Sequence, residues 1–321
     1  MKNISLLELA RKAGISKTTA SLILNGKSDR YKISSVTKAR VLRIAAEYSY
    51  KPNILARNLS MGKSMTVGVI IPGLHEVESV ELIENLEKEL IERDYQMVIG
   101  FTAYDEEKGR RIISEMVERR VDGILYVNPG GEIVEIENGS IPVVCVAHDA
   151  EEMPSVLIDI DTGVRKLIGY WYPRGKRSIG YVGLKVGNSD CKKSYKENYI
   201  ERFSMQGDNM FLLKNENDYD KLKKALASLI TKGVNAILFE TPGLTYLALK
   251  VVKELNRPSL NDISFGSFGY HSAFDVSAKE VIFVRKPAAA LAEKSISLLF
   301  NLMDGDKSVN TNIKVEPLFL F

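Results

Sequence analysis

Residues 15–27, ISKTTASLILNGK, combine hydroxyl, amide and ammonium groups with an apolar stripe. At helical spacing Ala20, Ile23 and Leu24 point to one side of this stretch. The other side carries Lys17, Thr18, Ser21, Leu22 and Asn25. Such polar groups can hydrogen-bond to base edges and phosphates, so the pattern favours a helix that enters a groove of DNA. The alternative is an ordinary surface helix that covers a core.

The charge of the chain is divided unevenly along its length. Residues 1–60 hold 12 basic and 3 acidic residues, a net charge of +9, whereas the remainder has a net charge of −6. A basic arm on an acidic body suggests that the arm alone has a polyanionic partner. A basic surface that is merely solvated is the alternative.

The usual marks of catalysis and metal binding do not occur in the sequence. His75, His148 and His271 are scattered, and Cys145 and Cys191 are far apart. There is no P-loop, no dinucleotide-binding glycine motif after a strand and no G-x-S-x-G turn. We therefore expect that the protein is not an enzyme and that it has neither a cofactor nor a metal site. The sequence also lacks an apolar stretch of about 20 residues and an apolar signal peptide, so we expect a cytoplasmic protein.

Capping residues place three helices in the first 50 residues. Ser5 and Glu8 have the spacing of a capping box, and Gly14 ends the first helix. Ser16 can cap the second helix, and Ser34 or Ser35 can cap the third. The buried stripe of the third helix is expected to consist of Val36, Val41, Ile44, Ala45 and Tyr48. The stretch is therefore a small all-α helix-turn-helix unit.

After Met65 the sequence alternates apolar strands with amphipathic helices. The expected strands include TVGVIIP, YQMVIGF, GILYV and IPVVCVA, and a second set includes RSIGYVGL, NMFLLKN, NAILFE and ISFGSF. Alternation of this kind predicts parallel sheets covered by helices. Because the pattern repeats, we expect an α/β core with two lobes and a cleft between them.

The first 64 residues resemble the lactose-repressor family of bacterial transcription regulators. The resemblance rests on A-x-x-A-G-I-S, T-x-S-x-x-L-N-G, I-S-x-x-T-x-x-R-V and Y-x-P-N-x-x-A-R-x-L. The remainder is similar to the periplasmic-binding-protein-like core of that family, including Arg285-Lys286-Pro287 before the last long helix. The resemblance implies a headpiece (1–52), a hinge helix (53–64), an N-subdomain (65–158 plus 287–315) and a C-subdomain (159–286 plus 316–321).

The resemblance also implies which residues contact DNA. Lys17, Thr18 and Leu22 match the main base-reading positions, with Thr19 and Ser21 beside them. The positions that contact the sugar-phosphate backbone are Ser5, Ser16, Asn25, Tyr50 and Asn53. In the hinge we expect contacts from Ala56, Arg57 and Leu59, with Leu59 wedged into a central base step of the minor groove.

Leu22 departs from the arginine or other polar residue that is usual in the family. An aliphatic side chain cannot select guanine through paired hydrogen bonds, but it can contact a thymine methyl group. We therefore predict a preference for A·T at the base pair that Leu22 faces. The alternative is that Leu22 packs and reads no base.

The core departs from the family at the three stretches that usually clamp a small effector. These stretches read YKENY at 195–199, TPGLT at 241–245 and GSFG at 266–269, without the usual arginine and aspartates. A typical free sugar is therefore disfavoured. Three alternatives remain: a more apolar or aromatic effector, control by a protein partner, or loss of effector control. For the first alternative, the candidate effector-binding residues are Tyr195, Thr241, Phe268 and His271.

We conclude from the sequence that the chain is a sequence-specific DNA-binding regulator, and more specifically a repressor. One headpiece reads only a few base pairs, so a pseudo-palindromic operator requires a homodimer. The alternative is a two-lobed small-molecule binding protein without a DNA role. That class predicts an export signal and no basic headpiece.

Overall fold

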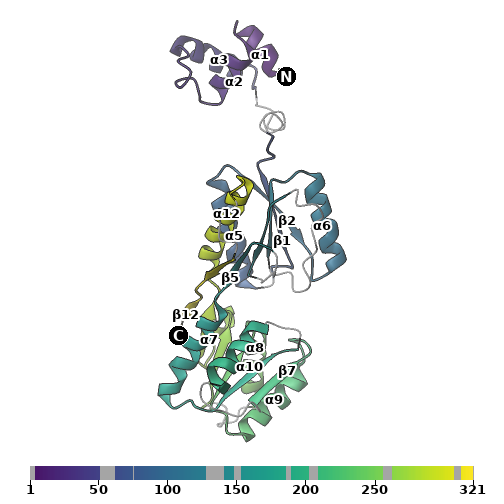
Figure 1. Cartoon of the computed structure of the whole chain (residues 1–321), viewed down its shortest axis with the longest axis vertical. Helices are drawn as coiled ribbons and strands as arrows, with labels where there is room; N and C mark the ends of the chain where they lie inside the picture. Colours follow the sequence, from purple (N-terminus) through teal and green to yellow (C-terminus); the bar gives the residue numbers. More distant parts are fainter. Residues whose placement is uncertain are drawn as a thin grey trace. The chain divides into compact units, whose positions relative to one another are not determined.

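The computed structural model describes residues 4–50, 62–74, 76–127, 141–147, 153–185, 189–201, 209–255, 262–306 and 312–320. The chain divides into two compact units, Met1–Ser64 and Met65–Phe321 (Figure 1). No helix in these ranges is both long enough and apolar enough to span a bilayer.

The first unit consists of the three predicted helices, α1 (Leu6–Lys12), α2 (Lys17–Leu24) and α3 (Ser35–Glu47). Each begins at a serine whose hydroxyl accepts a backbone N–H three residues later: Ser5, Ser16 and Ser34. The capping box of Ser5 and Glu8 is complete. Gly14, after α1, has a φ of +63°, which suits glycine in the tight turn to α2.

A small apolar cluster holds the three helices together. It consists of Leu9, Ala10, Ala13, Ala20, Ile23, Val41 and Ile44. The prediction that Val36 belongs to the buried stripe of the third helix is wrong, because Val36 is 76% exposed. Val36 lies in the first turn of α3, and its spacing to Val41 puts it on another face of the helix.

In the second unit, the first lobe is a parallel sheet in the order β11-β5-β4-β3-β1-β2. Its strands are β1 (Thr66–Ile71), β2 (Gln96–Phe101), β3 (Gly123–Val127), β4 (Val143–Val146), β5 (Ser155–Ile158) and β11 (Asn312–Val315). Helices α5 (Val77–Ile91) and α12 (Ala288–Met303) cover one face, and α6 (Glu106–Glu118) covers the other (Figure 1).

The second lobe is a sheet in the order β12-β10-β9-β8-β6-β7. Its strands are β6 (Ile179–Leu184), β7 (Met210–Leu213), β8 (Ala236–Phe239), β9 (Ser264–Phe268), β10 (Val281–Arg285) and β12 (Leu318–Leu320). Helices α7 (Ile160–Trp171) and α8 (Ser189–Tyr195) pack on one face, and α9 (Tyr219–Thr231) and α10 (Pro242–Leu255) pack on the other.

The predicted two-lobed α/β core is therefore confirmed, with one departure from the parallel pattern. Strand β12 runs antiparallel to β10 at the edge of the second sheet. The chain passes between the sheets after β5, after β10 and between β11 and β12. Each lobe thus contains segments that are distant in sequence.

Candidate nucleic-acid interface

The surface of α2 separates the apolar and polar residues of the helix. Ala20 and Ile23 are buried in the cluster of the first unit. Lys17, Thr18 and Asn25 are exposed, whereas the sites predicted at Thr19, Ser21 and Leu22 are half-buried. The helix and its C-cap therefore present one ammonium group, three hydroxyl groups, one amide group and one partly exposed aliphatic side chain. This is a set of groups that can contact base edges and phosphates.

Ser16 fixes the start of this surface. Its Oγ accepts the Thr19 N–H at 3.0 Å and lies 2.8 Å from Thr19 Oγ1. No acidic residue occupies the first turn of α2. The partial positive charge of the helix N-terminus and the charge of Lys17 therefore act together, which favours an anionic partner.

Asn25 follows the last residue of α2. Its Nδ2 donates to the Ser21 carbonyl oxygen at 2.9 Å and lies 3.2 Å from Ser21 Oγ. These contacts fold the amide back onto the helix and fix the orientation of both side chains. Asn25 and Ser21 are thus positioned before any partner binds.

The expected backbone contacts Ser5 and Tyr50 lie at other parts of the unit. The N–H of Ser5 donates to Glu8 Oε2 at 2.7 Å, and Ser5 Oγ lies 2.9 Å from the same oxygen. Tyr50 packs against the apolar cluster, and burial raises the pKa of its hydroxyl. Tyr50 is therefore uncharged at neutral pH and can donate a hydrogen bond. The predicted hinge contacts Asn53, Ala56, Arg57 and Leu59 lie outside the described residues.

Basic side chains are exposed on α1, on α3 and in the loop between α2 and α3. Exposed examples are Arg11, Lys12, Lys27, Arg30, Lys32, Arg40 and Arg43. Tyr48 raises the pKa of Lys12 by accepting a hydrogen bond from its Nζ at 3.0 Å. Lys38 pairs with Asp29 at 3.7 Å, but the Asp29 side chain is 88% exposed, so this pair is weak. Most of the positive charge is thus presented to solvent.

The structure places the candidate effector residue Tyr195 in the core of the second lobe. The side chain is fully buried, and its hydroxyl donates to the Ile179 carbonyl oxygen at 2.7 Å. Its ring packs against the rings of Tyr181 and Tyr199, with centroids 5.1 and 5.3 Å away. Burial raises the pKa of this hydroxyl. In this arrangement Tyr195 stabilises the lobe and has no exposed surface for a ligand.

The other three candidate effector residues follow strands of the second sheet. Phe268 ends β9, is 4% exposed and belongs to the apolar cluster under α7. Thr241 follows β8, and its Oγ1 accepts the Leu244 N–H at 3.2 Å. His271 stacks on Tyr246 with ring centroids 4.7 Å apart. Within the described residues, no hydrogen bond or ring contact joins any two of the four, so their effector role stays a prediction.

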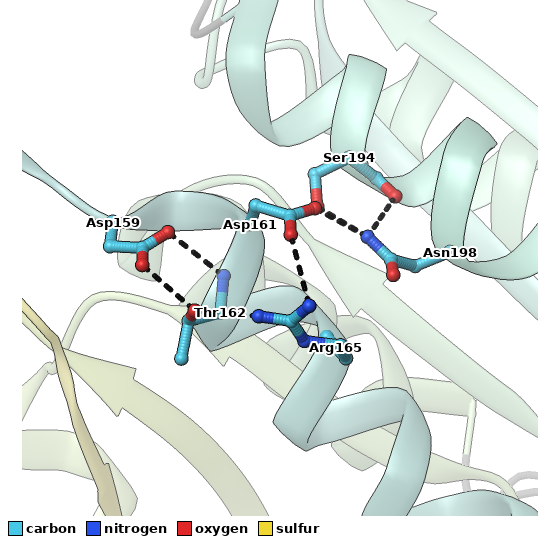
Figure 2. Close-up of polar contacts among 6 residues, drawn as sticks. All are labelled: Asp159, Asp161, Thr162, Arg165, Ser194 and Asn198. Atoms are coloured by element: carbon cyan, nitrogen blue, oxygen red, sulfur yellow. Dashed lines mark hydrogen bonds and ion pairs between the residues drawn. The ribbon is translucent and has the colours of Figure 1, made fainter.

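A polar cluster at the start of α7 was missed by the sequence analysis. Asp161 Oδ1 accepts hydrogen bonds from Ser194 Oγ at 2.9 Å and from Asn198 Nδ2 at 2.5 Å, and Arg165 lies on its other side (Figure 2). Asp159 caps the same helix through the Thr162 N–H. The cluster fixes α8 and the helical turn after it against α7. No local sequence signal could have shown this contact, because its partners are more than 30 residues apart.

Glu240, directly after β8, is a second buried carboxylate that the sequence analysis missed. It is 4% exposed and accepts hydrogen bonds from Tyr181 Oη at 2.8 Å and from the Leu184 N–H at 2.9 Å. Gly183 permits this approach, since a Cβ there would lie 2.0 Å from Glu240 Oε2. The contacts tie β6 to β8 at their carboxyl ends.

Comparison with known proteins gives matches to the headpiece and to the whole chain. Residues 5–53 match the family model described as "Bacterial regulatory proteins, lacI family". Catabolite control protein A of Staphylococcus xylosus is 25% identical over 324 residues, covering 97% of this chain and 95% of the relative. A catabolite repressor/activator of Salmonella typhimurium is 34% identical over 122 residues, covering 38% of this chain and 36% of the relative.

Solved structures share the fold along the whole chain. A lac repressor dimer bound to operator and the anti-inducer ONPF has a TM-score of 0.81 and 17% identity, covering 100% of this chain and 98% of that one. A transcriptional regulator CelR–cellobiose complex has a TM-score of 0.66 and 18% identity, covering 99% of both chains.

Proposed function

The chain belongs to the lacI family of bacterial regulatory proteins, and we propose that it is a transcriptional repressor that binds a pseudo-palindromic operator as a homodimer. The exposed polar face of α2, on a capped and strongly basic unit, is the observation that carries this proposal. A helix of this kind can enter the major groove, while exposed cations elsewhere on the unit contact phosphates.

Two copies are needed because one α2 contacts only a few base pairs. A twofold-symmetric dimer places two such helices on two half-sites, which makes a palindromic operator the matching target. The lac repressor structure that shares this fold is a dimer bound to operator, in agreement with this arrangement. We assign residues 53–64 to the hinge between the headpiece and the core, with Leu59 as the minor-groove wedge.

We place the protein in the cytoplasm and assign it no catalytic activity. This follows its relatives, a catabolite control protein A and a catabolite repressor/activator, whose names are those of regulators. Two of the similar structures hold a small molecule, ONPF in the lac repressor dimer and cellobiose in CelR. A small-molecule effector for this chain is therefore part of the proposal. Its chemistry differs from that of a typical free sugar, since the usual charged clamps are replaced at 195–199, 241–245 and 266–269.

The experiment that tests the proposal is a search for the operator followed by a binding assay. Genomic fragments retained by the purified chain are sequenced, and a palindrome found in them is titrated at 50 and 200 mM salt. If each dimer neutralises about six to ten phosphates, affinity falls by roughly 10³ to 10⁵ between these concentrations. Equal binding of the palindrome and of a scrambled duplex would contradict the proposal.

Leu22 permits a separate test of base reading. Operators are selected from a randomised pool with the wild type and with Leu22→Arg, and the two consensus sequences are compared. We expect an A·T pair to change to G·C at one position in each half-site, because arginine pairs with guanine and leucine contacts a thymine methyl. An unchanged consensus would show that Leu22 reads no base, and it would leave the proposed function intact.

A further inference from the structure

Glu78 is a charged residue buried at the contact between the two lobes of the core. The residue is 2% exposed, although it lies in the first turn of α5. Its Oε1 accepts the Tyr270 N–H at 3.1 Å and the Lys286 N–H at 3.0 Å. Its Oε2 lies 3.4 Å from Lys286 Nζ and accepts no hydrogen bond within the described residues.

These contacts cross from one lobe to the other. Helix α5 packs on the first sheet, whereas Tyr270 follows β9 and Lys286 follows β10 of the second sheet. Lys286 also lies in the segment through which the chain returns from β10 to α12. The Glu78 carboxylate therefore holds one of the connections about which the lobes would move.

Two further ion pairs flank Glu78 at the same contact. Glu76 accepts from Lys286 Nζ at 2.8 Å, and Glu81 contacts Arg285 directly. The side chain of Lys286 is 26% exposed and those of its partners Glu76 and Glu78 are 39% and 1% exposed. Glu78 is thus the member of the cluster that is withdrawn from water.

Gly269 provides the space that the Glu78 carboxylate occupies. It has a φ of +105°, and a Cβ at this position would lie 3.3 Å from Glu78 Oε2 and 2.9 Å from Pro242 Cδ. Any side chain here would be strained and would crowd the carboxylate. The second lobe therefore has a backbone shape that admits an anion at this point.

Burial raises the pKa of the Glu78 carboxyl, and Lys286 together with the two N–H donors works against that rise. Burial also works to lower the pKa of Lys286, but Glu76 and Glu78 raise it overall. A buried carboxylate is tolerated only where donors replace its water. Two backbone N–H groups and one ammonium group form such a donor set, and their chemistry suits any carboxylate that reaches them.

We propose that the N–H groups of Tyr270 and Lys286, with Lys286 Nζ, form a carboxylate-binding site in the second lobe, and that Glu78 of the first lobe fills it as a built-in ligand. The lobes are thereby clasped without a small molecule. Because it concerns the core alone, this inference does not depend on the proposed DNA binding.

The first test is chemical rescue of the full-length Glu78→Ala variant. Removal of the carboxymethyl group leaves a space that suits acetate, and a ligand that binds only the folded state raises the Tm. We expect acetate to raise the Tm of Glu78→Ala above its value in chloride at equal ionic strength, with saturation. The wild type and Glu87→Ala, a change at an exposed position of α5, should show no such difference. Equal Tm values for Glu78→Ala in acetate and chloride would overturn the proposal.

The second test measures the separation of the lobes. Spin labels are attached through Glu107→Cys on α6 and Lys224→Cys on α9, two exposed positions, while Cys145 and Cys191 are buried. We expect a narrow distance distribution for the wild type, a longer and broader one for Glu78→Ala, and recovery of the narrow one with acetate. Glu78→Gln keeps the shape and loses the charge, so it should also broaden the distribution if Glu78→Ala does not fold. A distribution identical to the wild type in the variant measured would contradict the clasp.

Discussion

Ser16 is expected to have two separable roles, in the stability of α2 and in the charge of the surface that faces DNA. Ser16→Ala removes the acceptor of the Thr19 N–H, a bond of 3.0 Å. Loss of such a cap costs about 1 kcal/mol. Helix α2 has only 8 residues, of which Ala20 and Ile23 are buried, so little else stabilises its first turn.

A cost of about 1 kcal/mol corresponds to roughly a fivefold change in an opening equilibrium. We therefore expect the amide protons of α2 in the DNA-free, full-length Ser16→Ala variant to exchange about fivefold faster than in the wild type. Ser34→Ala is the matched control, since Ser34 caps α3 through Thr37 in the same way. Its effect should be confined mainly to the amide protons of α3.

Ser16→Asp separates the two roles, because aspartate is as good a cap as serine and its charge suits the helix N-terminus. The amide protons of α2 in Ser16→Asp should therefore exchange at the wild-type rate. Affinity for the operator, measured by fluorescence anisotropy, should nevertheless fall, since the new carboxylate faces phosphates. Wild-type operator affinity in Ser16→Asp would refute the placement of the start of α2 against DNA.

Two more substitutions test the division of the chain and the burial of a cation. Leu9→Ala removes a fully buried side chain from the small cluster of the first unit, at a cost of about 2–5 kcal/mol, so operator binding should be lost while the Tm of the core stays unchanged. Leu7→Ala, at a 47% exposed position, is the control. A fall in the Tm of the core with Leu9→Ala would contradict the separation into two units. Burial lowers the pKa of Lys279 to about 8, so its charge disfavours the folded state below that pH and this cost fades as the pH rises toward 10.5. Lys279→Met should raise the Tm at pH 7, and this gain in Tm should vanish near pH 10 in thermal unfolding. Lys224→Met, at an exposed position of α9, is the control. A gain that is the same at both pH values, or equal to the gain of the control, would be inconsistent with this cause.

Local signals predicted the parts of the structure that depend on nearby residues. The three serine caps were visible because the hydroxyl and its N–H partner are three residues apart. The strands β1 and β3 were visible because they are apolar and buried along nearly their whole length. By contrast, β11 and β12 are short and partly exposed, so their sequences carry no clear strand pattern.

The contacts that were missed depend on the tertiary fold. Glu78 meets Tyr270 and Lys286, which are 192 and 208 residues away in the chain. Nothing in the sequence around Glu78 distinguishes it from the exposed glutamates of the same helix. Tyr195 was singled out by its position in a family motif, but four-residue spacing places it and Tyr199 together in the core. Only the packing of α8 against β6 decides that outcome.

The most direct test of DNA recognition by the basic first unit is the ratio of two affinities, for a palindrome recovered from the native chromosome and for a scrambled duplex of equal length. Measured with the full-length chain at physiological salt, this ratio should be at least about 10³. It should collapse for Lys17→Ala combined with Thr18→Ala, while the Tm of the core is unchanged. A ratio near one for the wild type would contradict the account.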